Sequence, residues 1–445
     1  MTTIVEGKNS IVKLLGKQRL RNTEYRLIKY VLREDCENGI LLHNVITGKL
    51  VLLNKEEAAF VEKLPCFPKE CACALINDYF LVPVSYNEKE LVDGLRALIN
   101  KAFPSKGINN YTILTTTNCN ARCFYCYENN YKHINMSAET ASCLTEYMIN
   151  QKDGGMLRIE WFGGEPLLCS NRIDQICYEL KQKGIKFVSG ITSNGYLFDK
   201  LLVSKAVSEW NLNHIQITID GTEEIYNKTK SYVSVKGSPY KRVMKNVRLL
   251  LDSGVIVSVR LNLDLHNEQD LKALIDELKS SFANYSNLIV YVHVTFRGSG
   301  YCPIKRSDLE ERSLYIRQVE FNKYIEQLGL SKPRKELASL NTHSCTADND
   351  NSIIVYPDGT LYKCEHLNEG DRVGSINSQL KDTNNYLKYK ITITRDGCDD
   401  CPLYPKCMLL KECPGIDYCN DQTCAYNIEI QHGIIQTRYN EYINK

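Results

Sequence analysis

The sequence predicts an α/β protein whose central part is a partial TIM-like (βα)6 barrel. Apolar runs of strand length alternate with amphipathic helical stretches between residues 111 and 294, a pattern typical of parallel βα repeats. Polar or glycine-rich motifs follow the first four strands, where a βα barrel places its ligand-binding loops. Less regular segments flank this part, and the second is rich in cysteine. We therefore expect three domains, at residues 1–105, 106–305 and 306–445.

The barrel strands are expected at residues 111–114, 157–161, 186–191, 214–219, 255–261 and 288–294. The helices between them are expected at residues 138–150, 172–183, 200–210, 239–251 and 269–280, where apolar positions recur with the helical period. Parallel strands end at one rim, so the residues that follow each strand should lie together there.

Four motifs occupy this rim in chain order. A cysteine loop follows the first strand, Gly163–Pro166 the second, Thr192–Gly195 the third and Asp220-Gly221 the fourth. Each motif alone is compatible with an ordinary turn. Their repeated position at the strand ends indicates a ligand site.

The fifth strand carries Arg260, Asn262 and Asp264 at every second position, which places them on one face. Polar residues on a parallel strand indicate a face that lines a wet or ligand-filled lumen. The alternative for Arg260 is an internal ion pair with Asp264 or Glu165, because buried charges are usually paired.

The cysteine loop holds Cys119, Cys123 and Cys126. Three thiolates are one ligand short of a closed metal site, and soft thiolates favour iron–sulfur clusters, zinc or Cu(I). A cubane with three protein thiolates keeps one iron free for a small molecule. The alternative is a set of buried or zinc-bound cysteines, although His133 does not stand where such a site needs a ligand.

Charge and composition narrow the class of protein. The chain has 445 residues with 55 Lys and Arg against 53 Asp and Glu, so a net charge of +2 does not indicate a nucleic-acid partner. No apolar run of membrane-spanning length and no signal-peptide layout at the N-terminus is seen, so we expect a cytoplasmic protein without a membrane partner. In that compartment, 19 cysteines favour metal ligation over disulfides.

A second set of cysteines lies in the last third of the chain. Its members are Cys345, Cys364, Cys398, Cys401, Cys407, Cys413, Cys419 and Cys424. The turn Pro357-Asp358-Gly359 between two apolar runs predicts a hairpin that presents Cys364. Because C-x2-C pairs also suit zinc, a zinc ribbon at Cys398, Cys401, Cys407 and Cys413 is the alternative.

The first hundred residues are expected to hold strands and short helices. Residues 40–45 and 50–53 predict a hairpin, Asn54 and Glu57 a capping box for a helix through Leu64, and residues 79–84 a further strand. Seven further cysteines are expected as small apolar core residues rather than ligands: Cys36, Cys66, Cys71, Cys73, Cys143, Cys169 and Cys177.

Residues 111 to about 300, with the loop Cys119-x3-Cys123-x2-Cys126 and Tyr125 before its last cysteine, resemble the radical S-adenosylmethionine (SAM) enzymes. The resemblance implies that the three cysteines hold a [4Fe-4S] cluster whose free iron binds SAM. It also implies roles in SAM binding for the rim residues. Gly163, Gly164 and Glu165 would accept the methionine ammonium, Ser193 and Asn194 would reach the ribose, Arg260 would meet the carboxylate, and Tyr125 would lie near adenine.

The later cysteines resemble the SPASM domain, which houses two auxiliary [4Fe-4S] clusters in peptide and protein maturases. By that resemblance the first auxiliary cluster is held by Cys345, Cys364 and Cys413, and the second by Cys398, Cys401, Cys407 and Cys424. The fourth ligand of the first stays open between Cys419, Cys302 and a free iron position. The spacing also departs from the family, because five residues instead of three separate Cys407 from Cys413.

The same resemblance assigns a general base. Related sulfatase-maturing enzymes place an acid just after the cysteine that corresponds to Cys364, so Glu365 is the candidate catalytic residue. His366 is the adjacent alternative, and a surface turn without a catalytic role is the other.

The N-terminal part resembles the small winged-helix domain with which peptide-modifying enzymes hold a leader peptide; a packing cap on the barrel is the alternative. Together the resemblances imply a radical SAM maturase with three [4Fe-4S] clusters, a ribosomally made precursor peptide and an electron donor of flavodoxin or ferredoxin type. A sulfatase-maturing enzyme that forms formylglycine and a non-catalytic zinc-binding interaction protein are the alternatives.

Overall fold

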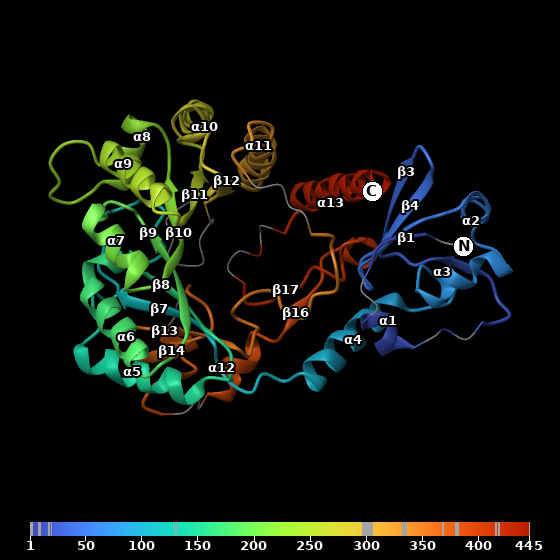
Figure 1. Ribbon diagram of the computed structural model, residues 1–445, viewed down its shortest axis with the longest axis horizontal. Helices are drawn as coiled ribbons and strands as arrows, with labels where there is room; N and C mark the ends of the chain where they lie inside the picture. The colour runs from blue at the N-terminus through green and yellow to red at the C-terminus, as the bar shows by residue number, and fades with distance from the viewer. Residues whose placement is uncertain are drawn as a thin grey trace.

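The computed structural model describes residues 3–7, 10–16, 18, 20–129, 131–295, 306–331, 336–366, 369–378, 382–413, 416 and 419–444. Figure 1 shows the barrel at one end of the molecule, an N-terminal sheet at the other and the C-terminal segments between them. Among the described helices, none combines the length and apolar character that a bilayer crossing demands.

The barrel is a parallel sheet of six neighbouring strands in chain order, as predicted. The strands are β7 (Asn110–Thr116), β8 (Leu157–Gly163), β9 (Phe187–Ser193), β10 (Leu212–Ile219), β11 (Ile256–Leu263) and β12 (Leu288–Val294). The five expected helices are confirmed as α5 (Ala138–Gln151), α6 (Ser170–Gln182), α7 (Lys200–Ser208), α9 (Pro239–Asp252) and α10 (Glu268–Phe282). Helix α11 (Asp308–Gln327) follows β12, and α8 (Glu223–Lys230) was not expected because its sequence is almost entirely polar.

Alternation along the strands separates the core from the lumen. The odd-numbered residues of β8, such as Ile159 and Trp161, are buried in the core that α5, α6, α7, α9 and α10 cover. The even-numbered residues face the opposite side and include polar ones, for example Glu160 on β8 and Thr192 on β9. Side chains on this inner face bond across strands, as Tyr291 on β12 does to Gln216 on β10 at 2.6 Å. The predicted polar lumen is thus present.

The C-terminal region extends the barrel sheet. Strand β13 (Ser352–Val355) pairs in parallel with β7, and β14 (Thr360–Tyr362) and β15 (Gly374–Ser375) follow in antiparallel pairing. The predicted hairpin is confirmed, and its turn needs Gly359, which has a φ of +85° and lies against Ile376. Short elements complete this region: α12 (Thr383–Lys388) and the pair β16 (Thr392–Ile393) and β17 (Leu409–Leu410). The last helix is α13 (Asp421–Ile443).

The N-terminal part is built on a four-stranded antiparallel sheet in the order β1-β5-β4-β3. Its strands are β1 (Thr3–Glu6), β3 (Val31–Cys36), β4 (Gly39–Asn44) and β5 (Lys49–Leu52), and β2 (Tyr25–Leu27) pairs with β6 (Leu81–Pro83). The helices are α1 (Ser10–Leu15), α2 (Lys55–Val61), α3 (Cys73–Asn77) and α4 (Glu88–Ala102). The predicted hairpin and the Asn54–Glu57 capping box are confirmed, although α2 ends three residues before Leu64.

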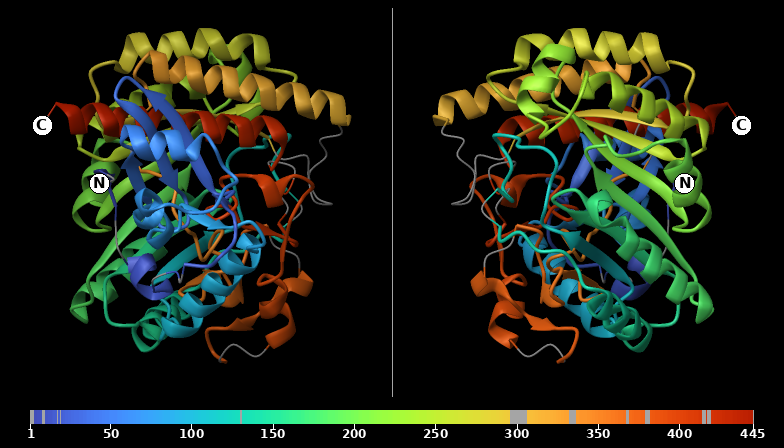
Figure 2. Two further views of the ribbon diagram at one scale, coloured as in Figure 1. Left: turned by 90° about the vertical axis from the view of Figure 1, so that its right-hand side faces the viewer. Right: turned by 90° about the vertical axis from the view of Figure 1, so that its left-hand side faces the viewer.

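One face of this sheet packs on the C-terminal helix. Leu32, Leu41 and Leu50 form one apolar cluster with Ile435 and Tyr439 of α13. Figure 2 shows α13 crossing the blue strands. The packing partner of the N-terminal sheet is therefore the C-terminal region, whereas the alternative drawn from the sequence was a packing cap on the barrel.

The non-ligand cysteines divide by exposure. Cys169 and Cys177 are buried as expected, and Cys36, Cys66 and Cys71 are half-buried. The expectation is wrong for Cys73 and Cys143, which are exposed on the outer surfaces of α3 and α5. Apolar character alone could not tell the inner face of these helices from the outer one.

Candidate cluster and cofactor site

The cysteine loop leaves the end of β7 and holds three enclosed thiols. Burial raises the pKa of Cys119 and of Cys126 to about 12 and also raises the pKa of Cys123. Charges at Cys119 and Cys123 raise the pKa of Cys126 further, so the three sulfurs lie within electrostatic reach of one another. At this enclosed position the thiolate form is favourable over the thiol only when a soft metal cation binds it. The set of three cysteine donors fits an iron–sulfur cluster.

Backbone bonds fix this loop to the neighbouring rim. The Arg122 N–H donates to the Lys230 carbonyl at 2.8 Å, and the Val233 N–H donates to the Asn120 carbonyl at 2.9 Å. The Asn120 side-chain oxygen accepts from the Asn194 amide at 2.7 Å. The loop after β7 is thus tied to the loops after β9 and β10, which brings three of the predicted rim motifs together.

A buried triad holds Tyr125. Its hydroxyl donates to Asp220 at 2.8 Å and accepts from the Lys230 ammonium at 2.9 Å, and Lys230 lies 3.2 Å from the second Asp220 oxygen. Burial raises the pKa of Tyr125 well above its ordinary value, so the hydroxyl stays protonated. The sequence does not single out Lys230, because one lysine in a polar helix carries no signal. The same ammonium lowers the pKa of Cys123 against the effect of burial, so it supplies positive charge beside the loop.

The glycines after β8 allow a close approach of two backbones. Gly163 has a φ of +120°, and a Cβ there would lie 2.1 Å from the Thr116 carbonyl oxygen. A Cβ on Gly164 would lie 2.4 Å from the Asn118 carbonyl oxygen. The Glu165 N–H then donates to that Asn118 oxygen at 2.8 Å. Both glycines are needed to lay this turn against the cysteine loop.

Glu165, after β8, is hydrogen-bonded to residues at and directly after the end of β9. It is fully buried, and its carboxylate accepts from the Ser193 hydroxyl at 2.8 Å and from the N–H groups of Asn194 at 2.8 Å and Leu167 at 3.2 Å. Burial raises the pKa of Glu165 to about 7, while these hydrogen bonds act in the opposite direction. The structure brings Glu165, Ser193 and Asn194 together, as predicted, and gives the carboxylate and the Ser193 hydroxyl partners within the protein.

Arg260 lies in the lumen on β11. Its guanidinium donates to the Asn262 side chain at 2.9 Å and lies 3.2 Å from His293 Nδ1. Burial, assisted by this positive charge, lowers the pKa of His293 to about 3, so the ring is neutral. Asp264 instead pairs with Arg306 at 2.9 Å, and Arg306 also reaches Glu311 at 2.7 Å.

Glu365 lies against the cysteine loop. The Tyr131 hydroxyl donates to the Glu365 carbonyl at 3.2 Å, and the Tyr127 ring stacks on His366 with 4.0 Å between ring centres. Glu128, which sequence analysis did not single out, is buried beside it. Burial raises the pKa of Glu128 to about 8, with the Glu365 charge as the second cause. Glu128, two residues after Cys126, and Glu365, directly after Cys364, therefore lie within electrostatic reach of each other.

The C-terminal cysteines fall into two sets. Cys364 and Cys413 pack on Ala347, Tyr389 and Leu410, and the charges of Cys345 and Cys413 both affect the Cys364 thiol, whose pKa burial raises strongly. We call these three the first set: Cys345, Cys364 and Cys413. Cys302, the other candidate for this set, lies outside the described residues.

The second set holds five cysteines: Cys398, Cys401, Cys407, Cys419 and Cys424. A hydrogen bond from Cys424 lowers the pKa of Cys419 to about 6, and the Cys419 charge adds to the effect of burial in raising the pKa of Cys401 and Cys407. Within the part of the chain that the structure covers, Cys419 thus lies beside Cys424 and within electrostatic reach of Cys401 and Cys407.

No three Cys, His, Asp or Glu side chains in the described segments are placed to hold a single metal ion. A cubane does not need such a group, because each thiolate meets a different iron.

Comparison with known proteins identifies the barrel. Residues 113–278 match the radical SAM superfamily. An uncharacterized protein of Methanocaldococcus jannaschii is 26% identical over 306 residues, which cover 65% of this chain and 92% of that protein. A probable GTP 3',8-cyclase of the same organism is 27% identical over 146 residues, which cover 33% of this chain and 46% of that protein.

Solved structures share the fold over most of the chain. Native anSMEcpe with bound AdoMet has a TM-score of 0.57 at 16% identity and covers 76% of this chain and 100% of its own. SuiB of Streptococcus suis bound to S-adenosylmethionine has a TM-score of 0.52 at 17% identity and covers 90% of this chain and 99% of its own. The barrel, the rim motifs and the family match agree, and they exclude the non-catalytic alternative. The barrel of this chain is therefore a radical SAM domain.

Proposed function

We propose that this enzyme is a maturase that abstracts a hydrogen atom from a ribosomally made peptide and carries two auxiliary clusters in a SPASM-type C-terminal region. One observation carries the proposal: the three-thiolate loop and two further cysteine sets are gathered in one molecule, with Glu128 on the loop and Glu365 directly after Cys364 of the first set. A radical SAM enzyme that only cleaves its cofactor needs no such sets.

When bound, a [4Fe-4S] cluster and SAM together supply the electron and the 5'-deoxyadenosyl radical that this chemistry needs. The chain's own residues would bind and orient SAM and the cluster. The Gly163-Gly164 turn leaves backbone carbonyls at the rim for the methionine ammonium, Asn194 lies within reach for the ribose, and Tyr125 is held for the adenine side. Arg260 would offer a fixed cation to the carboxylate. Lys230 keeps positive charge beside the thiolates.

The carboxyl pair would handle the substrate proton. A peptide that loses a hydrogen atom and an electron to form a new bond must also release a proton. Glu365, directly after Cys364, would accept the proton, and the auxiliary clusters would take up the electron. Glu128, buried and close to Glu365, would share that proton. The first set has three thiols among the described residues, so a substrate thiolate or the unplaced Cys302 would complete it.

A peptide substrate is supported by two observations. Solved structures of the same fold include SuiB bound to precursor peptide SuiA, with a TM-score of 0.51, and anSMEcpe with the Cp18Cys peptide, with a TM-score of 0.56. The N-terminal sheet of this chain also ends in β3 and β1 as its edge strands, and an edge strand can take an extended leader by β-augmentation. An external flavodoxin- or ferredoxin-type protein would deliver electrons. Formylglycine formation is the rival outcome, and it would use the same acid after Cys364.

The test is reductive SAM cleavage by the anaerobically reconstituted chain. Replacing Cys119, Cys123 and Cys126 by Ala should abolish 5'-deoxyadenosine formation. The matched control replaces two exposed cysteines outside all three sets, Cys73 and Cys143, and should keep the wild-type rate. Equal cleavage by the triple variant and the wild type would overturn the proposal.

A further inference from the structure

A cavity of about 310 Å³ lies at the amino end of the barrel, away from the SAM rim. It is lined by Asn110, Arg158, Val188 and Asn213, which stand at or next to the starts of four strands, and by Glu160, Gly190 and His214 deeper in the lumen. Thr346, directly after Cys345, closes one side. The cavity therefore reaches from the inner face of the barrel strands to the residue next to Cys345, and its size is that of a ligand site.

Glu160 is an acidic group in the lining of this cavity. Its carboxylate accepts one hydrogen bond, from the Thr192 hydroxyl at 3.1 Å. In the part of the chain that the structure covers, no cation pairs with it, and burial raises its pKa to about 7. An enclosed carboxylate without a counter-ion destabilises the protein unless a cation binds to it.

Gly190 makes the room for this carboxylate. A Cβ on Gly190 would lie 2.2 Å from the second Glu160 oxygen and 3.4 Å from His214 Nδ1. His214 is neutral in this place, since burial lowers its pKa, and its other ring nitrogen lies 3.1 Å from the Ser258 hydroxyl. Because Gly190 has no side chain, the Glu160 carboxylate has room beside the cavity.

Resting on the proposed function, we propose that this cavity is a subsite for a basic side chain, Lys or Arg, of the peptide substrate, with Glu160 as its counter-ion. A long aliphatic stem with a terminal cation suits a narrow lumen that carries an acid inside. Arg158, exposed at the mouth, would exclude a basic side chain that does not insert fully and would favour an acidic neighbour in the peptide.

The position of Glu160 also sets the distance between the substrate residue that is anchored and the substrate residue that reacts. Glu160 precedes the end of β8 at Gly163 by three residues, which is about 10 Å along a strand. An extended peptide spans that distance in about three residues. The basic residue would thus anchor the substrate about three positions from the residue whose hydrogen is removed.

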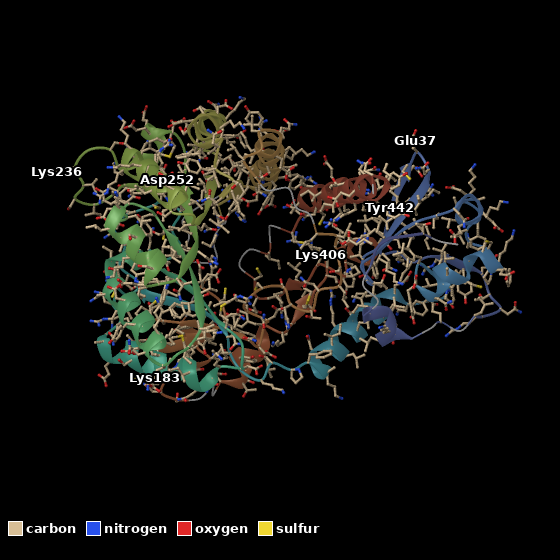
Figure 3. The ribbon with its side chains drawn as sticks, viewed as in Figure 1. Glu37, Lys183, Lys236, Asp252, Lys406 and Tyr442 are labelled. Carbon is tan, nitrogen blue, oxygen red and sulfur yellow. The ribbon has the colours of Figure 1, made fainter. Side chains whose placement is uncertain are left out.

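The test compares two small probes, Nα-acetyl-lysine amide and Nα-acetyl-norleucine amide, which differ by the cation. Binding to the reconstituted enzyme is measured by ligand-observed NMR. We expect the wild type to bind the lysine probe at least tenfold more tightly, and Glu160→Gln to lose that preference. The matched control is Glu146→Gln, since Glu146 pairs with Lys183, which lies on the outer surface of the barrel (Figure 3).

Either of two results would overturn the proposed subsite: no preference for the lysine probe in the wild type, or the same preference in Glu160→Gln. If Glu160→Gln does not fold, Gly190→Ala tests the same point, because its Cβ must displace the carboxylate. Retained preference in a folded Gly190→Ala would also overturn it. Wild-type SAM cleavage is measured alongside. Its absence together with a lysine preference would count against the radical mechanism and leave the subsite standing.

Discussion

At the scale of single residues, the site depends on side chains that hold others in place. Lys230 and Asp220 are almost fully buried and tie Tyr125 to the rim after β10, while Glu165 ties the rim after β8 to that after β9. The cysteine spacing and the rim motifs could be predicted from the sequence because their residue types are rare and their order along the strands is regular. Lys230 and Glu128 could not, because their importance arises from burial, which the sequence does not show.

Lys230→Met should destabilise the protein by about 3–5 kcal/mol, since it leaves the Asp220 carboxylate buried without its cation. Denaturant unfolding measures the loss. Lys228→Met, on the exposed side of the same helix, should change stability by less than about 0.5 kcal/mol. Adding Asp220→Asn to Lys230→Met should recover part of the loss, because the unpaired charge is then gone. A further loss of the full size would show that the two residues act independently.

Glu365→Gln should keep SAM cleavage and lower peptide turnover at least tenfold, about 1.4 kcal/mol of barrier, because the amide cannot accept the substrate proton. Product formation and 5'-deoxyadenosine are measured in one reaction, so that loss of coupling is seen directly. Glu412→Gln, another acid directly before a first-set cysteine, is the control. Turnover within twofold of the wild type would show that Glu128 or His366, and not Glu365, accepts the proton.

At the scale of helices and strands, α4 connects the N-terminal sheet to the second cysteine set. The Arg96 guanidinium donates to the carbonyls of Asn341 at 3.0 Å, Tyr404 at 2.9 Å and Cys407 at 2.7 Å, and it covers the Tyr404 ring at 5.1 Å. Lys406 of this loop lies between the barrel and the N-terminal sheet (Figure 3). One side chain of the N-terminal part thus shapes the loop that carries Cys398, Cys401 and Cys407.

Arg96→Ala should therefore lose the second auxiliary cluster and keep the others, so that iron falls from about twelve to about eight per chain. Iron analysis and the low-temperature EPR spectrum of the reduced protein measure this. Lys101→Ala, exposed on the same helix, should retain all the iron. Full iron content in folded Arg96→Ala would show that the loop holds its shape without the N-terminal part.

The barrel elements were predictable because period-two and period-3.6 patterns are strong in strands and helices that are buried on one side. Strands β1, β2 and β3 were missed because they are short or carry charged residues such as Arg33 and Asp35 on an exposed face. The pairing of β13 with β7 joins residues more than 240 positions apart, and no local pattern contains that information. The sheet therefore shows what the sequence could not: the C-terminal cysteines are built onto the edge of the barrel.

At the scale of the whole molecule, three cysteine groups share one chain, and their ligand sets can be told apart by metal content. Wild-type protein reconstituted without oxygen should bind about twelve iron, as three cubanes imply. The second set offers five thiols for four positions, so Cys419→Ala and Cys424→Ala should each keep about twelve, whereas the double variant should fall to about eight. Iron and zinc are measured together with absorbance near 400 nm. If Cys419→Ala alone removes four iron and Cys424→Ala does not, Cys419 is a ligand of the first set and the division into three and five is wrong. Zinc as the dominant metal would contradict all three clusters.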